Sequence, residues 1–65
     1  MDLWDMADVI YKSGGYIGNI DGADCVVVSS QQAVRHIREK LGTGFDIYVI
    51  QRREGGETYI TGENG

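Results

Sequence analysis

Apolar residues recur at helical spacing between Ser29 and Gly42, and charged residues fill the other side of the same segment. Ser29 and Gln32 have the spacing of a capping box, in which each side chain satisfies a free backbone N–H of the other residue. Gly42 stands where a helix commonly ends in a left-handed residue. We therefore predict a helix over residues 29–42. Its apolar stripe consists of Ala33, Val34, Ile37 and Leu41.

Residues 2–12 show a shorter stretch with the same spacing. Asp2 is suited to the N-cap, and Gly14 with Gly15 ends the segment. A helix of this length is unstable alone in water, so it must pack its apolar side on another element. The apolar side consists of Leu3, Met6, Ala7 and Ile10, and Trp4 and Tyr11 flank it.

The remaining segments alternate as strands do. Residues 16–28 predict a hairpin around the turn Asp21–Gly22, with Ile20 opposite Ala23. Residues 45–53 and 57–62 predict a second hairpin around Gly55–Gly56. Three consecutive valines at 26–28 suit a strand in the middle of the sheet.

The element order is therefore helix, two strands, helix, two strands. It predicts one small α+β domain over residues 1–65, in which a four-stranded antiparallel sheet carries both helices packed on one face. The order of the strands within the sheet does not follow from the pattern.

The amino-acid composition argues against several classes of function. The chain has one cysteine and one histidine, so an internal disulfide is impossible and we expect no metal and no cofactor. No apolar run approaches the roughly 20 residues of a membrane span, and the N-terminal segment is acidic, so we expect a cytoplasmic protein without a membrane partner. The net charge of −4 argues against direct binding to nucleic acid.

The negative charge is unevenly distributed. Residues 1–24 hold five aspartates and one lysine, whereas residues 25–65 hold five acidic and five basic residues. A row of surface carboxylates can imitate the phosphates of a nucleic acid and attract a basic groove. The alternative is that the acids only keep a small protein soluble. The five aspartates are Asp2, Asp5, Asp8, Asp21 and Asp24.

Two other functions, RNA binding and nucleophilic catalysis, fit the sequence less well. The basic residues at positions 35–53, with Tyr48 and Tyr59 as stacking platforms, suggest RNA binding, but glutamates interrupt them. Cys25 and His36 suggest a nucleophile and its base, yet Cys25 falls in an apolar strand and no third group is present to orient the histidine. We therefore expect no catalytic residues and no enzymatic activity.

The segment VVVSSQQAVRHIREKLGTGFDIYVI has a strand ending in Ser, a Q-A-x-x-x-I helix, Leu-Gly and an alternating strand. In this it resembles small phage and mobile-element inhibitor proteins, including type I anti-CRISPR proteins and inhibitors of host RNA polymerase. The resemblance implies a stoichiometric inhibitor. It also implies, for an acidic member, a DNA mimic that occupies a DNA-binding surface of a CRISPR surveillance complex.

The sequence thus predicts a non-catalytic inhibitor that binds a basic protein surface. The alternatives are an inhibitor of RNA polymerase and a small interaction module that dimerises through a sheet edge or through the face carrying Tyr48 and Tyr59, so the protein is a monomer or a weak homodimer. The expected contacts are Asp2, Asp5, Asp8, Asp21 and Asp24, with Glu54 and Glu57 secondary and Trp4 and Tyr11 as aromatic anchors.

Overall fold

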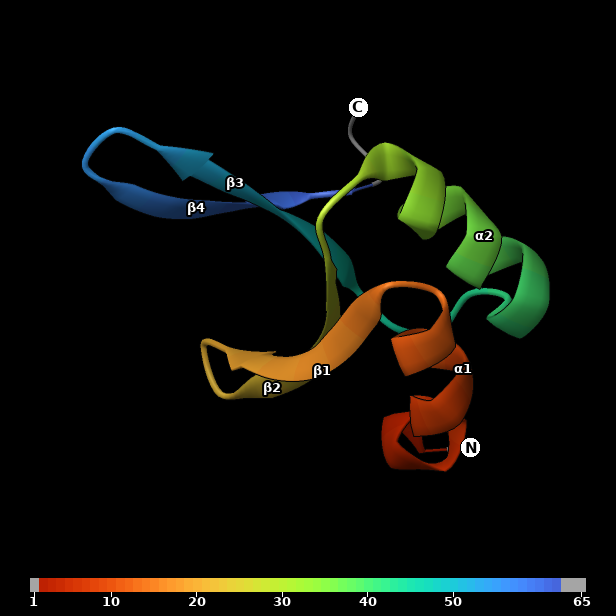
Figure 1. Ribbon diagram of the computed structural model, residues 1–65. Helices are drawn as coiled ribbons and strands as arrows, with labels where there is room; N and C mark the ends of the chain where they lie inside the picture. Colours follow the sequence, from red (N-terminus) through yellow and green to blue (C-terminus); the bar gives the residue numbers. More distant parts are fainter. Residues whose placement is uncertain (1, 63–65) are drawn as a thin grey trace.

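The computed structural model describes residues 2–62 and shows a small α+β domain (Figure 1). A 3₁₀ helix, η1 (Leu3–Met6), leads directly into α1 (Ala7–Lys12), and a longer helix, α2 (Gln31–Leu41), lies in the middle of the chain. Two hairpins flank α2. Their strands are β1 (Gly15–Ile20), β2 (Ala23–Val28), β3 (Ile47–Arg53) and β4 (Gly56–Thr61). This element order confirms the predicted fold class.

The four strands form one sheet in the order β1-β2-β3-β4, and the central pair is parallel. The expectation of a wholly antiparallel sheet is therefore wrong at β2 and β3. An α2 of eleven residues spans about 16 Å, close to the length of a six-residue strand. The helix thus carries the chain back to the end of the sheet where β2 began, and β3 must run in the same direction as β2.

The first hairpin has the predicted register, with Ile20 opposite Ala23 and Tyr16 opposite Val27. Its turn residues, Asp21 and Gly22, have φ angles of 54° and 84°. Two consecutive positive φ angles are what a type I′ turn requires, and the twist of this turn matches that of the strands it joins.

The second hairpin turns one residue earlier than predicted, at Glu54–Gly55, so that Arg53 pairs with Gly56. Moving a two-residue turn by one position shifts the strand pairing by two residues, and the side-chain faces are therefore preserved. Val49 lies directly opposite Ile60, and Ile50 lies opposite Tyr59, on the faces that the sequence predicts for them.

The central helix also begins one residue later than the pattern suggests. Ser30, rather than Ser29, is the N-cap, and its hydroxyl accepts a hydrogen bond from the backbone N–H of Ala33 at 3.2 Å. At the other end, Gly42 has a φ of 77° and donates its N–H to the carbonyl of Arg38 at 2.9 Å, as expected for a helix-ending glycine.

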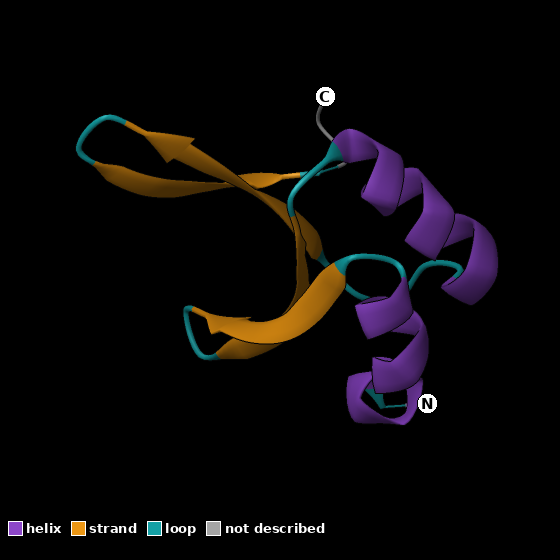
Figure 2. Cartoon of the chain, in the orientation of Figure 1, coloured by secondary structure: helices purple, strands orange, loops and turns teal. Residues whose placement is uncertain are grey.

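Both helices cover the same face of the sheet, as predicted (Figure 2). Close approach between strands and between sheet and helix depends on two glycines. A Cβ added at Gly15 would lie 2.8 Å from Val28 Cγ1, and one at Gly62 would lie 2.8 Å from Val34 Cγ2. The buried core consists of Leu3, Ile10, Val26, Val28, Val34, Ile37, Ile47 and Val49.

The face of the sheet away from the helices is also partly closed. Cys25 and Val27 point to this face, and both are buried. The ring of Tyr16 lies beside Gly18, where a Cβ would meet Tyr16 Cε2 at 3.7 Å and Val27 Cγ2 at 3.1 Å. Partial burial and the nearby side chain of Tyr59 raise the pKa of Tyr16. Tyrosines from both edge strands thus shelter the centre of this face.

Replacement of Ser30 by alanine tests the helix boundary. We expect Ser30→Ala to lower the free energy of unfolding by about 1 kcal/mol, because the N–H of Ala33 loses its acceptor. The matched change Ser29→Ala should alter it by less than about 0.5 kcal/mol. Urea denaturation of both variants measures the difference, and a larger loss for Ser29→Ala would contradict this boundary.

Candidate protein-binding surface

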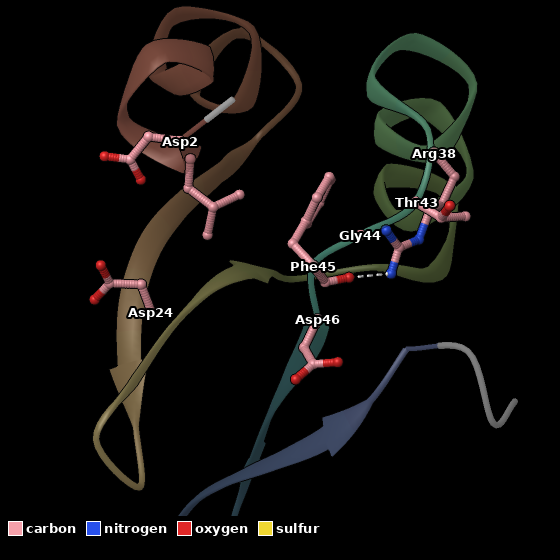
Figure 3. Close-up of a pocket in the computed structure, with 8 residues that line it drawn as sticks. Asp2, Asp24, Arg38, Thr43, Gly44, Phe45 and Asp46 are labelled. Atoms are coloured by element: carbon pink, nitrogen blue, oxygen red, sulfur yellow. Dashed lines mark hydrogen bonds between the residues drawn. The ribbon is translucent and has the colours of Figure 1, made fainter.

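A shallow depression of about 550 Å³ lies at the end of the sheet where β2 and β3 begin. Figure 3 shows Asp2 and Asp24 on one side of it and Arg38 on the other, with Phe45 and Asp46 between them. Three carboxylates therefore surround the opening.

The parallel pairing of β2 and β3 brings two of these carboxylates together. Asp24 lies near the start of β2, and Asp46 directly precedes β3. Parallel neighbours begin at the same end of a sheet, and the N–H of Val26 donates to the carbonyl of Asp46 at 3.0 Å. The third carboxylate belongs to Asp2, the N-cap of η1, and the buried side chain of Leu3 fixes this end of η1 on the core.

Arg38 supplies positive charge to the depression and also holds its wall together. Its guanidinium donates to the carbonyl of Phe45 at 2.7 Å and to that of Gly42 at 3.1 Å, and it stacks 4.7 Å from the centre of the Phe45 ring. Burial lowers the pKa of Arg38, and the charge of Asp46 opposes this shift. The side chain remains cationic at neutral pH, and it joins α2 to the segment that enters β3.

The acidic row continues along the N-terminal helices. Asp5 and Asp8 are exposed, and the carboxylate of Asp5 accepts a hydrogen bond from the backbone N–H of Asp2 at 3.4 Å. Within residues 2–62, no Lys or Arg side chain forms an ion pair with Asp2, Asp5, Asp8 or Asp24. We call Asp2, Asp5, Asp8, Asp24 and Asp46 the acidic surface.

Two large aromatic side chains lie beside the acidic surface. Trp4 is 54% exposed and Tyr11 is 55% exposed. Tyr11 lies three residues after Asp8 on α1, so these two side chains are neighbours on the helix surface, and Trp4 lies on η1 next to Asp5 in sequence. Exposed aromatic side chains next to charge are typical of protein-binding surfaces.

The other predicted contacts lie elsewhere. Asp21 is in the first hairpin turn and Glu54 in the second, and both turns project on the side away from α1 and α2 (Figure 1). Glu57 lies on β4, where its carboxylate pairs with Arg52 at 3.5 Å on an exposed surface. The structure therefore does not bring these three residues into the acidic surface.

Asp46 belongs to the acidic surface but was missed by sequence reasoning. Its segment was predicted as the beginning of a strand, and the charge count placed it in the neutral part of the chain. Only the parallel pairing places it at the same end of the sheet as Asp24. The strand–helix–strand order was the available signal, because a helix between two neighbouring strands favours parallel pairing.

Cys25 and His36 do not form a reactive pair. The Cys25 thiol lies on the helix-free face, 3.6 Å from the carbonyl oxygen of Gly18, whereas His36 is exposed on α2 across the sheet. Burial, and to a lesser extent the charges of Asp46 and Asp24, raise the pKa of Cys25. A buried thiol with a raised pKa is a poor nucleophile.

Among residues 2–62, no group of three or more His, Cys, Asp or Glu side chains is arranged to hold a metal ion. No helix in the same range has the length and apolar character needed to cross a membrane.

The chain matches no protein-family model, no curated protein and no solved structure.

The burial of Cys25 predicts low reactivity toward a thiol reagent such as DTNB. At pH 8 we expect the folded protein to react at least about a hundredfold more slowly than the same protein in urea, because exposure of Sγ requires an opening that costs a few kcal/mol. Absorbance of the released thiolate measures both rates. Equal rates would show that the helix-free face is open to solvent.

Proposed function

We propose that this protein is a non-catalytic inhibitor that acts in the cytoplasm of the host cell. It would be an anti-CRISPR protein that mimics DNA and binds a basic, nucleic-acid-binding surface of its partner. One observation carries the proposal: the five carboxylates of the acidic surface are exposed, and within residues 2–62 four of them, those of Asp2, Asp5, Asp8 and Asp24, form no ion pair with a Lys or Arg side chain. Asp2 makes this surface continuous, because it lines the depression with Asp24 and Asp46 and donates its N–H to Asp5.

Unpaired carboxylates generate a field that reaches beyond the protein. At physiological ionic strength this field extends about 8 Å before salt screens it. A groove lined with Lys and Arg for phosphate binding would be attracted, and the attraction would accelerate association. Charges paired within the protein would have a weaker effect of this kind, so the absence of such pairs at Asp2, Asp5, Asp8 and Asp24 among the described residues supports binding in addition to solubility.

The exposed aromatic side chains can stabilise an interface in a way that charged side chains alone do not. Rim charges mainly change the rate of association, whereas large aromatic side chains that become buried at an interface contribute much of its stability. Trp4 on η1 and Tyr11 on α1 are each more than half exposed. We expect them to act as the anchors around which the carboxylates orient the partner.

The kind of partner follows from the resemblance to phage inhibitor proteins. A DNA-binding surface, whether of a CRISPR complex or of RNA polymerase, must present Lys and Arg to the phosphates, and the acidic surface suits either. We favour the CRISPR surveillance complex, and the RNA polymerase inhibitor remains the second candidate.

An electrophoretic mobility assay with a purified type I surveillance complex and its target DNA tests the proposal. The protein, added in stoichiometric amount before the DNA, should prevent formation of the DNA complex, and the inhibition should weaken as salt is raised. A transcription assay with host RNA polymerase tests the second candidate. If neither assay shows inhibition at low salt, the proposed function is wrong.

Charge reversal tests the location of the contact. We expect Asp5→Lys/Asp8→Lys to weaken inhibition by about tenfold or more, a loss of at least about 1.4 kcal/mol, because two attractive charges become repulsive. The control Glu39→Lys/Glu54→Lys makes the same change in net charge on α2 and on the distal hairpin turn. Circular dichroism should show that both variants fold.

The control distinguishes a specific surface from overall acidity. Inhibition by Glu39→Lys/Glu54→Lys should stay close to that of the unmodified protein. An equal loss of inhibition in both variants would mean that only the net charge of the protein matters. That result would contradict a specific role for the acidic surface.

A further inference from the structure

Within the described residues, β4 forms an unprotected edge of the sheet. It is the last strand in the order β1-β2-β3-β4, and all six of its residues are exposed. Natural edge strands are commonly blocked by lysine, proline, a bulge or a covering element. The segment Gly56–Thr61 contains no lysine or proline, and it pairs without a bulge with β3. Its outer backbone groups are therefore available to another strand.

The direction of those backbone groups follows from one hydrogen bond. The N–H of Gly62 donates to the carbonyl of Ile47 at 2.8 Å, so Gly62 directs its backbone groups toward β3. Directions alternate along a strand, so Ile60 also faces β3. The intervening residues therefore direct their N–H and C=O groups outward. These residues are Glu57, Tyr59 and Thr61.

The helices do not cover β4. Ile60 shares the helix-facing side with Val49, yet it is 36% exposed while Val49 is 5% exposed. Figure 1 shows the hairpin of β3 and β4 extending away from both helices. A two-stranded ribbon is only marginally stable in water, and a third strand with further apolar contact stabilises it.

We propose that a second copy of this chain supplies the third strand, through antiparallel pairing of β4 with β4 about a two-fold axis at Tyr59. With Tyr59 opposite Tyr59, Glu57 lies opposite Thr61 of the second copy, and Thr61 lies opposite its Glu57. In this register all the outward N–H and C=O groups of the three residues find partners. The two sheets join into one of eight strands.

The side chains favour the same register. The two Glu57 carboxylates are kept apart, because each lies opposite a threonine, and each remains beside its own Arg52. The Tyr59 side chains lie on the helix-free face, and each stays near Tyr16 of its own chain, so neither blocks the edge. On the helix-facing side, Ile60 lies opposite Thr58 of the second copy. The edge is thus complementary to itself, which favours a second copy over an unrelated strand.

Sedimentation equilibrium of the full chain tests the association. We expect a mass of two chains at high protein concentration. Tyr59→Lys should return the mass to one chain, because two ammonium groups would meet at the axis. The matched variant Tyr11→Lys, which is similarly exposed on α1, should remain dimeric. A single-chain mass for the unmodified protein at every concentration would overturn the proposal, as would a dimer that survives Tyr59→Lys.

Cysteine cross-linking tests the register, and buried Cys25 leaves the introduced thiol as the accessible one. Directly opposed residues lie about 5.5 Å apart at Cα, within the range of a disulfide. Tyr59→Cys should therefore cross-link on oxidation. Glu57→Cys should not, since its two copies would be more than about 13 Å apart, but a mixture of Glu57→Cys and Thr61→Cys should. Cross-linking of Glu57→Cys alone, or none with Tyr59→Cys, would overturn the register.

Discussion

The parallel pairing of β2 and β3 is the interaction on which the rest of the structure depends. It is the only seam that joins the two hairpins within the described sheet, and it places Val26 beside Ile47 and Val28 beside Val49 at the centre of the core. α2 spans this seam and buries Ile37 against it. The same pairing aligns the starts of β2 and β3. The acidic depression is therefore a consequence of how the core is built.

Local signals predicted the parts of the fold that depend on neighbouring residues. Asp21–Gly22 fixed the first hairpin and its register, because that pair accepts the two positive φ angles of its turn. Where two identical residues are adjacent, the predicted boundary was wrong by one position. This happened at the N-cap of α2, where Ser29 precedes Ser30, and at the second hairpin turn, where Gly55 precedes Gly56. The direction of β3 relative to β2 is non-local. It depends on how far α2 carries the chain and on β2 and β3 being neighbours, so the strand–helix–strand order favours the parallel direction, and with it the position of Asp46, without fixing either.

Two kinds of chemistry meet on this small domain. The acidic surface combines exposed carboxylates with the guanidinium of Arg38, whose two Nη atoms donate to the carbonyls of Gly42 and Phe45. The β4 edge relies instead on backbone hydrogen bonding and on apolar side chains that the helices do not reach. The first suits a charged partner and depends on salt. The second suits an identical strand and is insensitive to salt, so the two interactions are separable.

The most direct test of this account is the direction of β3, measured by nuclear Overhauser effects between the side chains of the two central strands in solution. We expect strong contacts between Val26 and Ile47 and between Val28 and Val49, because residue numbers rise in the same direction along both parallel strands. Contacts in the reverse order, with Val28 next to Ile47 and Val26 next to Val49, would indicate antiparallel strands. That result would separate Asp46 from Asp24 and contradict the assembly of the acidic surface.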